Sequence, residues 1–135
     1  MGEQAAIATD EATARAFVEA ICDRRADDLA AVLAPDATLR ALLPGGPREW
    51  AGADAVARRF ARWFGDAELE VVEREVRPIG PRVQVRWLVR VRAERLGPGW
   101  RVVEQVAYVD ADAGGRIARL DLLCTGFLPE EGSDG

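Results

Sequence analysis

The sequence predicts an α+β fold in which a strongly curved sheet packs around three N-terminal helices. The first half of the chain has the residue spacing of helices, and the second half holds four short β runs separated by strong turn signals. Helices followed by an antiparallel meander are typical of α+β domains, in which the two kinds of element are segregated along the chain. A curved sheet closed by helices leaves a cavity, which favours a protein that binds a small molecule.

The first two helices are predicted from apolar spacing and from residues that begin or end a helix. Thr9 or Asp10 is expected to cap the first helix, whose apolar face carries four residues at helical spacing: Ala14, Phe17, Val18 and Ile21. A short second helix is expected to start at Asp27 and to be stopped by Pro35, because proline lacks the amide hydrogen that a helix interior needs.

A first strand and a third helix follow. Residues 37–43 are predicted to form the strand, and residues 44–47 (Pro-Gly-Gly-Pro) are predicted to form a loop by their composition. The third helix is expected from Gly52 to Phe64, with Gly65 just beyond its end. Its aromatic stripe is expected to pack against the sheet, although a ligand wall is the alternative interpretation; the stripe consists of Val56, Phe60, Trp63 and Phe64.

The remaining strands are predicted from a residue period of two. Residues 69–77 form a strand with a bulge at Val71-Val72, where the alternation breaks. Residues 82–92 alternate strictly, with valines and Trp87 on one face and mainly arginines on the other. Residues 100–110 and 117–124 form a last hairpin. We therefore expect one domain over residues 1–128, followed by a disordered acidic tail over residues 129–135.

The composition excludes several kinds of chemistry. The net charge of −5 argues against a nucleic-acid partner, and no apolar run approaches the length of a membrane span. All eighteen basic residues are arginine, so histidine-dependent triads and lysine Schiff bases are excluded. No metal site and no cofactor are expected. The absence of a signal peptide and two widely separated cysteines predict a cytoplasmic protein.

Four stretches, in this order and spacing, resemble the SnoaL-like branch of the nuclear transport factor two-like superfamily. They are Trp50-Ala51-Gly52-Ala53-Asp54-Ala55-Val56, Gly115-Arg116-Ile117-Ala118, residues 34–39 and residues 104–108. The resemblance runs from about Ala12 to Phe127. It implies a cone-shaped fold of three helices on a strongly curved sheet with an internal pocket, often dimeric through that sheet. It does not imply one activity, because relatives include isomerases, cyclases, epoxide hydrolases and proteins without catalysis.

The catalytic residues of well-known relatives transfer poorly to this chain. Where ketosteroid isomerases carry an oxyanion-hole tyrosine and a general-base aspartate, this sequence has Phe17 and Ala41. Where epoxide hydrolases carry Arg-x-Asp, it reads Gln105-Val106-Ala107. Neither ketosteroid isomerisation nor epoxide hydrolysis can proceed by the relatives' mechanisms without these catalytic groups. Whether the chain is an enzyme is left open.

A smaller set of polar residues is left as candidates. Asp121 interrupts the apolar run of residues 117–124, near the acid–base aspartate of SnoaL-like cyclases; in a dry cavity its pKa would rise. The alternative is an Asp on the solvent or dimer face, paired with an arginine. Glu104 and Gln105 lie on opposite faces of their strand, so one of them is expected to point inward and to orient a ligand, while Glu104 paired across strands with an arginine is the alternative. Tyr108 shares the face of Glu104.

Two functions of different classes remain. The first is a binding protein for a hydrophobic small molecule, with Asp121 and Glu104 as catalytic residues if it is a cofactor-free isomerase or cyclase acting on a carbonyl compound. Its expected ligand-binding residues are Phe17, Trp50, Phe60, Trp63, Trp87, Gln105 and Tyr108. The second is a non-catalytic dimerisation or regulatory module whose pocket is plugged by Trp87, Phe60 and Trp63. A homodimer is expected, and the arginine-rich stretch 74–101 is interpreted as the outer sheet surface rather than as an anion site.

Overall fold

The computed structural model describes residues 2–130, with side chains placed from Asp10 onward. Over these residues the chain forms helices α1 (Gly2–Cys22), α2 (Ala26–Val32) and α3 (Ala53–Phe64), a 3₁₀ turn η1 (Glu94–Leu96), and strands β1 (Leu33–Leu43), β2 (Gly46–Ala51), β3 (Glu68–Ile79), β4 (Arg82–Arg92), β5 (Arg101–Ala111), β6 (Ile117–Cys124) and β7 (Leu128–Pro129). No helix in this part of the chain is long and apolar enough to span a membrane.

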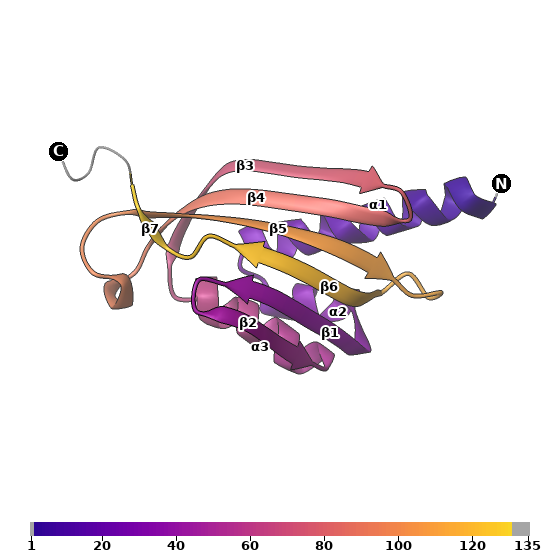
Figure 1. The fold of residues 1–135 in the computed structure, drawn as a ribbon, viewed down its shortest axis with the longest axis horizontal. Coiled ribbons are helices and arrows are strands. Elements are labelled where there is room, and N and C mark those ends of the chain that lie inside the picture. The colour runs from indigo at the N-terminus through magenta and orange to yellow at the C-terminus, as the bar shows by residue number, and fades with distance from the viewer. Residues whose placement is uncertain (1, 131–135) are drawn as a thin grey trace.

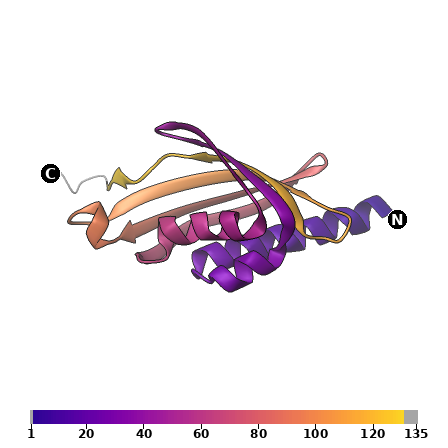
Figure 2. The ribbon, with the colours of Figure 1, turned by 90° about the horizontal axis from the view of Figure 1, so that it is seen from below.

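The long strands form one mixed sheet in the order β2-β1-β6-β5-β4-β3, and β7 pairs with β5 (Figure 1). All neighbours are antiparallel except β1 and β6, which run parallel. The three helices lie on one face of the sheet and leave the other face open (Figure 2). We call these the inner and the outer face. The predicted α+β fold of three helices on a mixed sheet is thereby confirmed, whereas the strong curvature of the sheet stays a prediction.

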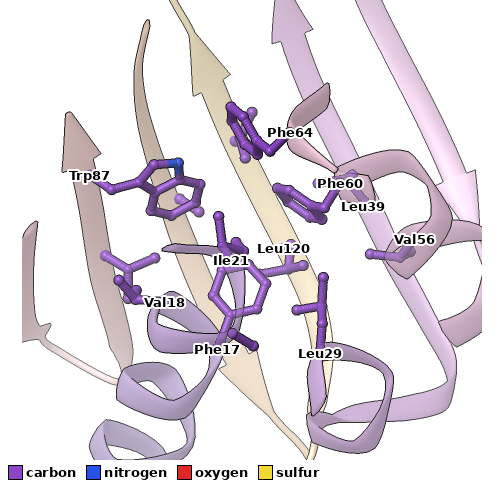
Figure 3. Packing of buried hydrophobic residues seen from close by; sticks show 14 of the residues in the cluster. Phe17, Val18, Ile21, Leu29, Leu39, Val56, Phe60, Phe64, Trp87 and Leu120 are labelled. Carbon is purple, nitrogen blue, oxygen red and sulfur yellow. The ribbon is translucent and has the colours of Figure 1, made fainter. Parts of the chain in front are cut away.

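The core forms between the helices and the inner face of the sheet. Alternate residues of β4, from Val83 to Val91, are each no more than 2% exposed, and Trp87 lies among them, facing Phe17 of α1 and Phe60 of α3 (Figure 3). The strict alternation predicted for this strand is confirmed. Fully burying one such apolar side chain is worth about 1.5–3 kcal/mol, so this face of β4 contributes strongly to the stability of the fold.

Two predicted helix boundaries are wrong. α1 begins at Gly2, well before Thr9 and Asp10, because the preceding residues are largely helix-forming Glu, Gln and Ala. α2 ends at Val32 and β1 begins at Leu33, so Pro35 lies inside a strand. The β1–β6 pairing is irregular between Leu33 and Thr38, and this irregular stretch accommodates a residue that cannot donate a backbone hydrogen bond.

The sequence did not predict β2. Gly46 and Pro47, assigned to a loop by composition, belong to this strand, and only Pro44 and Gly45 make the turn between β1 and β2. Pro47 is tolerated because β2 lies at the edge of the sheet, where a missing N–H disrupts no second neighbour. The predicted bulge in β3 is confirmed, since the pairing with β4 skips Val72 between Val71 and Glu73. At the other end of the chain, residues 131–135 of the predicted tail lie outside the described residues.

The turn between α1 and α2 has an unusual residue in it. Arg24 has φ = 56°, the left-handed conformation that glycine normally occupies after a helix. Its backbone N–H donates to Ile21 O at 3.1 Å and that of Arg25 to Ala20 O at 2.9 Å, which closes the end of α1. The Arg24 guanidinium donates to the carbonyl oxygen of Ala67, just before β3. The side chain thus joins this turn to the segment after α3.

This arrangement predicts different effects for two substitutions. Arg24→Ala loses the hydrogen bond to Ala67 and retains the steric strain of a left-handed backbone conformation. Its free energy of unfolding should therefore fall by about 1 kcal/mol relative to the original protein. Arg24→Gly loses the same hydrogen bond but removes the steric cost, so it should be more stable than Arg24→Ala by about 1 kcal/mol. Urea unfolding of the three proteins measures both differences. The reverse order of the two variants would contradict this account of the turn.

Candidate functional site

The first candidate site is the inner face of the sheet, where the predicted ligand-binding aromatic residues gather. Phe17 and Phe60 meet edge to face with ring centroids 5.6 Å apart, and Trp87 lies 5.9 Å from Phe17 and 6.4 Å from Phe60. Figure 3 shows that these rings come from α1, α3 and β4 and point toward one another. Edge-to-face contacts of this kind add to the stability that burial supplies.

The rings of Phe17, Phe60 and Trp87 leave no room for a ligand between them. Phe17 and Trp87 are 0% exposed and Phe60 is 2% exposed, so the space between the three rings is closed to solvent. Trp63 packs on Phe60 and on Trp50, with centroid distances of 5.2 and 5.9 Å, and both tryptophans are only partly buried. The space between the helices and the sheet is therefore filled by side chains at the position where the sequence predicted a pocket.

Gln105 is the inward-facing member of the Glu104–Gln105 pair. It is 1% exposed and accepts a hydrogen bond at Oε1 from Trp87 Nε1 at 3.0 Å. Its Nε2 donates to Cys124 Sγ at 3.2 Å. Glu104 points to the outer face, where its carboxylate accepts a hydrogen bond from Arg86 Nε. Of the two interpretations of Glu104, the cross-strand pair with an arginine is the one found here.

Asp121 also lies on the outer face rather than in the interior. Its Oδ2 accepts a hydrogen bond from Arg82 Nη2 at 2.8 Å and lies 3.4 Å from Arg119 Nε, while Oδ1 is 3.8 Å from Arg40 Nε. Partial burial alone would raise the pKa of Asp121, but the hydrogen bond from Arg82 and the three positive charges outweigh it and lower the pKa. A carboxylate that stays ionised cannot serve as the proton donor of an acid–base mechanism near neutral pH.

A second candidate site is a hollow of about 540 Å³ on the outer face, over β1, β2, β5 and β6. Its lining combines both charges with apolar surface: Arg40, Ala41, Leu42, Pro47, Arg48, Glu49, Tyr108, Asp121, Leu122 and Leu123. Leu42 and Leu123 are neighbours in the β1–β6 register and are 53% and 51% exposed. The Tyr108 hydroxyl accepts a hydrogen bond from Gln84 Nε2 at 3.1 Å, so its own hydrogen remains available to a partner.

The rest of the outer face is a network of ion pairs. Arginines of β3 and β4 pair with neighbouring carboxylates across this face: Arg77–Glu75, Arg86–Glu73, Arg90–Glu70 and Arg92–Glu68. The interpretation of the arginine-rich stretch as an outer sheet surface is confirmed for these arginines, whereas Arg74 shares the inward register of Trp87 and hydrogen-bonds Cys22 of α1. Arg95 is also an exception, because it donates to the carbonyl oxygens of Arg62 and Trp63 at the end of α3. Among the described residues, no three cysteine or acidic side chains gather closely enough to hold a metal ion.

Sequence reasoning missed part of the outer hollow. Arg48 and Glu49 were not considered because the strand that carries them, β2, was not predicted. Leu42 and Leu123 were counted as apolar strand residues with no indication that they face outward. A usable signal was present in the Pro-Gly turn followed by a short run ending in Trp50, which is compatible with a hairpin partner for residues 37–43.

Among curated proteins, none matches this sequence. Solved structures do match it in fold. A steroid delta-isomerase from Pseudomonas aeruginosa superposes with a TM-score of 0.61 and 21% identity over 87% of this chain and 80% of its own. An LEH-like epoxide hydrolase from M. tuberculosis gives a TM-score of 0.65 and 19% identity over 87% and 83%. A protein with a ketosteroid isomerase-like fold from Catenulispora acidiphila, solved in complex with trimethylamine, gives a TM-score of 0.62 and 16% identity over 82% of each chain.

At these levels of identity the structural matches show a shared fold and do not transfer an activity. The family assignment has a separate basis, because the model of the SnoaL-like domain matches residues 14–120, which is most of the chain. That range includes α2, α3 and the strands from β1 to β5, together with the start of β6 and the part of α1 that packs on the sheet. The chain therefore belongs to the family of SnoaL-like domains, within the nuclear transport factor two-like superfamily.

Proposed function

We propose that this protein is a non-catalytic SnoaL-like module that associates with a second copy of itself through the outer face of its sheet. The observation that carries this proposal is the closed interior, where Phe17, Phe60, Trp87 and Gln105 are at most 2% exposed. An isomerase or cyclase of this fold needs an inward carboxylate beside an open cavity. Both candidate carboxylates, Asp121 and Glu104, are bound to arginines on the outer face instead.

The outer hollow has the features of a self-complementary surface. Leu42 and Leu123 expose about half of their area side by side, an arrangement that is costly in water and favourable in an interface. Arg48 and Glu49 are adjacent, exposed and of opposite charge. In a two-fold dimer the same patch faces itself, so each arginine of one copy can meet the glutamate of the other.

Asp121 has a structural role in this proposal. With Arg82 it joins β6 to β4 across β5, since Arg82 also donates to Asp110 Oδ1 at 2.8 Å and to the Tyr108 carbonyl oxygen at 3.2 Å. Burial alone would lower the pKa of Arg82, but the hydrogen bonds that Arg82 donates to the two aspartates outweigh it and raise the pKa. The cluster fixes the floor of the outer hollow through charge-assisted hydrogen bonds.

The dimer proposal is tested by placing a charge in the apolar part of the hollow. Leu123→Asp should convert a concentration-dependent dimer into a monomer in sedimentation experiments. The dissociation constant of the dimer should rise by roughly 100-fold or more, because the substituted residue occurs twice in a two-fold interface. Far-UV circular dichroism should stay unchanged, since Leu123 is half exposed in the free chain.

Val72→Asp is the matched control, because Val72 is 49% exposed but belongs to the bulge of β3, away from the hollow. This variant should dimerise like the original protein. The proposal would be overturned if the original protein stayed monomeric at about 100 µM. It would also be overturned if Leu123→Asp and Val72→Asp weakened the dimer equally.

The structural role of Asp121 predicts a pH-dependent effect. Its pKa is lowered in the folded protein, so the stability it contributes is present above its unfolded pKa and is lost as the pH falls through the folded pKa. Asp121→Asn should therefore reduce the free energy of unfolding by about 1 kcal/mol at pH 7, with a smaller difference at about pH 3. Urea unfolding at both pH values measures this.

Asp36→Asn serves as the control, since Asp36 is exposed and has no ion pair among the residues with described side chains. It should leave the stability unchanged at both pH values. If Asp121→Asn behaved in the same way, the ion cluster would not stabilise the sheet.

A second candidate function is the binding of a hydrophobic small molecule on the inner face, and Gln105 favours it. This amide is a buried polar side chain in an apolar core, and one of its partners is a thiol, which is a weak acceptor. A ligand carbonyl or hydroxyl could replace Cys124 as the acceptor for Gln105 Nε2. Such binding requires the rings of Phe17, Phe60 and Trp87 to move apart.

The ligand-binding candidate is tested by a thermal-shift screen with steroid-like, polyketide, terpenoid and fatty-acid compounds. A ligand present at 100 times its Kd should raise the Tm by several degrees, because it adds about 2.7 kcal/mol to the stability. Gln105→Leu should abolish a shift that depends on the amide. If no compound class shifts the Tm, the interior is a packed core and this candidate is excluded.

A further inference from the structure

A hollow of about 120 Å³ lies among the ends of the three helices, away from the outer hollow, and of the three packed rings of the inner face it shares only Phe60. It is lined by Ala20, Ile21, Arg24, Arg25, Ala26, Leu29, Phe60, Ala61, Phe64 and Gly65. Figure 3 shows four of these side chains, Ile21 from α1, Leu29 from α2, and Phe60 and Phe64 from α3, gathered between the helices. Each of the four is 2–3% exposed, so the floor of the hollow is apolar and almost completely buried.

The hollow exists because small residues stand where the helices face one another. Ala20 and Ala61 carry only a methyl group, and Gly65 carries no side chain. A Cβ at position 65 would lie 2.5 Å from the carbonyl oxygen of Ala61, so the chain cannot fill the space from that position without moving its backbone. The turn at Arg24, tied to the carbonyl of Ala67, holds the rim in place on the other side.

The rim offers no free charge to a ligand. Arg25 Nη2 lies 3.0 Å from Asp23 Oδ2, and its Nε lies 3.2 Å from Asp28 Oδ2. Arg24 donates to a backbone carbonyl oxygen. Since these groups already have partners, the hollow is suited to an uncharged molecule whose contacts are almost entirely with methyl groups and aromatic ring edges.

We propose that this helix-end hollow, defined by the ten residues above, binds a small uncharged apolar molecule, such as an aromatic ring of benzene size. The size of the ligand follows from the volume of the hollow, because an apolar cavity of about 150 Å³ in another protein holds benzene. Here one side is open, so an edge of the ring can remain in solvent. The proposal stands independently of the dimer and of Gln105, neither of which contributes a residue to this hollow.

Benzene and benzoate are the matched probes for this site. Benzene at about 10 mM should raise the Tm by about 2–3 °C, whereas benzoate at the same concentration should leave it unchanged, because its charge would have to be desolvated beside an apolar floor. In a protein with labelled methyl groups, nuclear Overhauser effects from benzene should reach Ile21 and Leu29. Effects at Leu42 and Leu123 instead would place benzene in the outer hollow and overturn the proposal.

Ala61→Leu fills the hollow from its half-buried wall and suits a helix. It should abolish the Tm shift and the contacts of benzene with Ile21, while the variant itself folds normally. Ala12→Leu makes the same change on the exposed face of α1 and should retain both effects. An unchanged benzene response in Ala61→Leu, or no response in the original protein, would refute the site.

Discussion

The alternation of apolar and polar side chains along β4 is the constraint on which the rest of the structure depends. It places Trp87 and four valines against the helices and leaves the arginines between them on the opposite face. The inner row creates the core, because the rings from α1 and α3 close on Trp87. The outer row creates the network of ion pairs, because each arginine reaches carboxylates of the strands beside it. A shift of one residue would exchange the two environments and bury the charges.

Most of the fold was predictable from the sequence, because apolar residues recur at regular helix or strand spacing in the elements that form the core. α3, the bulge of β3 and the strands β4 and β6 follow directly from the spacing of apolar residues. The failures occur where local signals compete with pairing. β2 was missed because glycine and proline were interpreted as a loop, although an edge strand tolerates both. Pro35 was interpreted as a helix stop, although it lies in an irregular part of β1.

The candidate site was less predictable, because the direction of a polar side chain depends on strand register. In β6, Leu120 and Leu122 face inward, but Leu123 is apolar and faces outward, so the sequence does not reveal the side on which Asp121 lies. In β5 the sequence showed that Glu104 and Gln105 oppose each other, and the register with β4 determined that Gln105 meets Trp87. Nothing in the local sequence could indicate that three arginines from β1, β4 and β6 gather around one carboxylate.

The position of β6 has a consequence for how the chain reaches this structure. β6 lies between β1 and β5, so the sheet consists of a β1–β2 hairpin and a β3–β4–β5 meander that are joined only through β6. β6 is also the last of the long strands along the chain. During synthesis the two halves therefore cannot be united until about residue 124 has left the ribosome. Their pairing brings together residues some eighty positions apart, as with Leu39 and Leu120, which makes the closing of the sheet a slow, non-local step of folding.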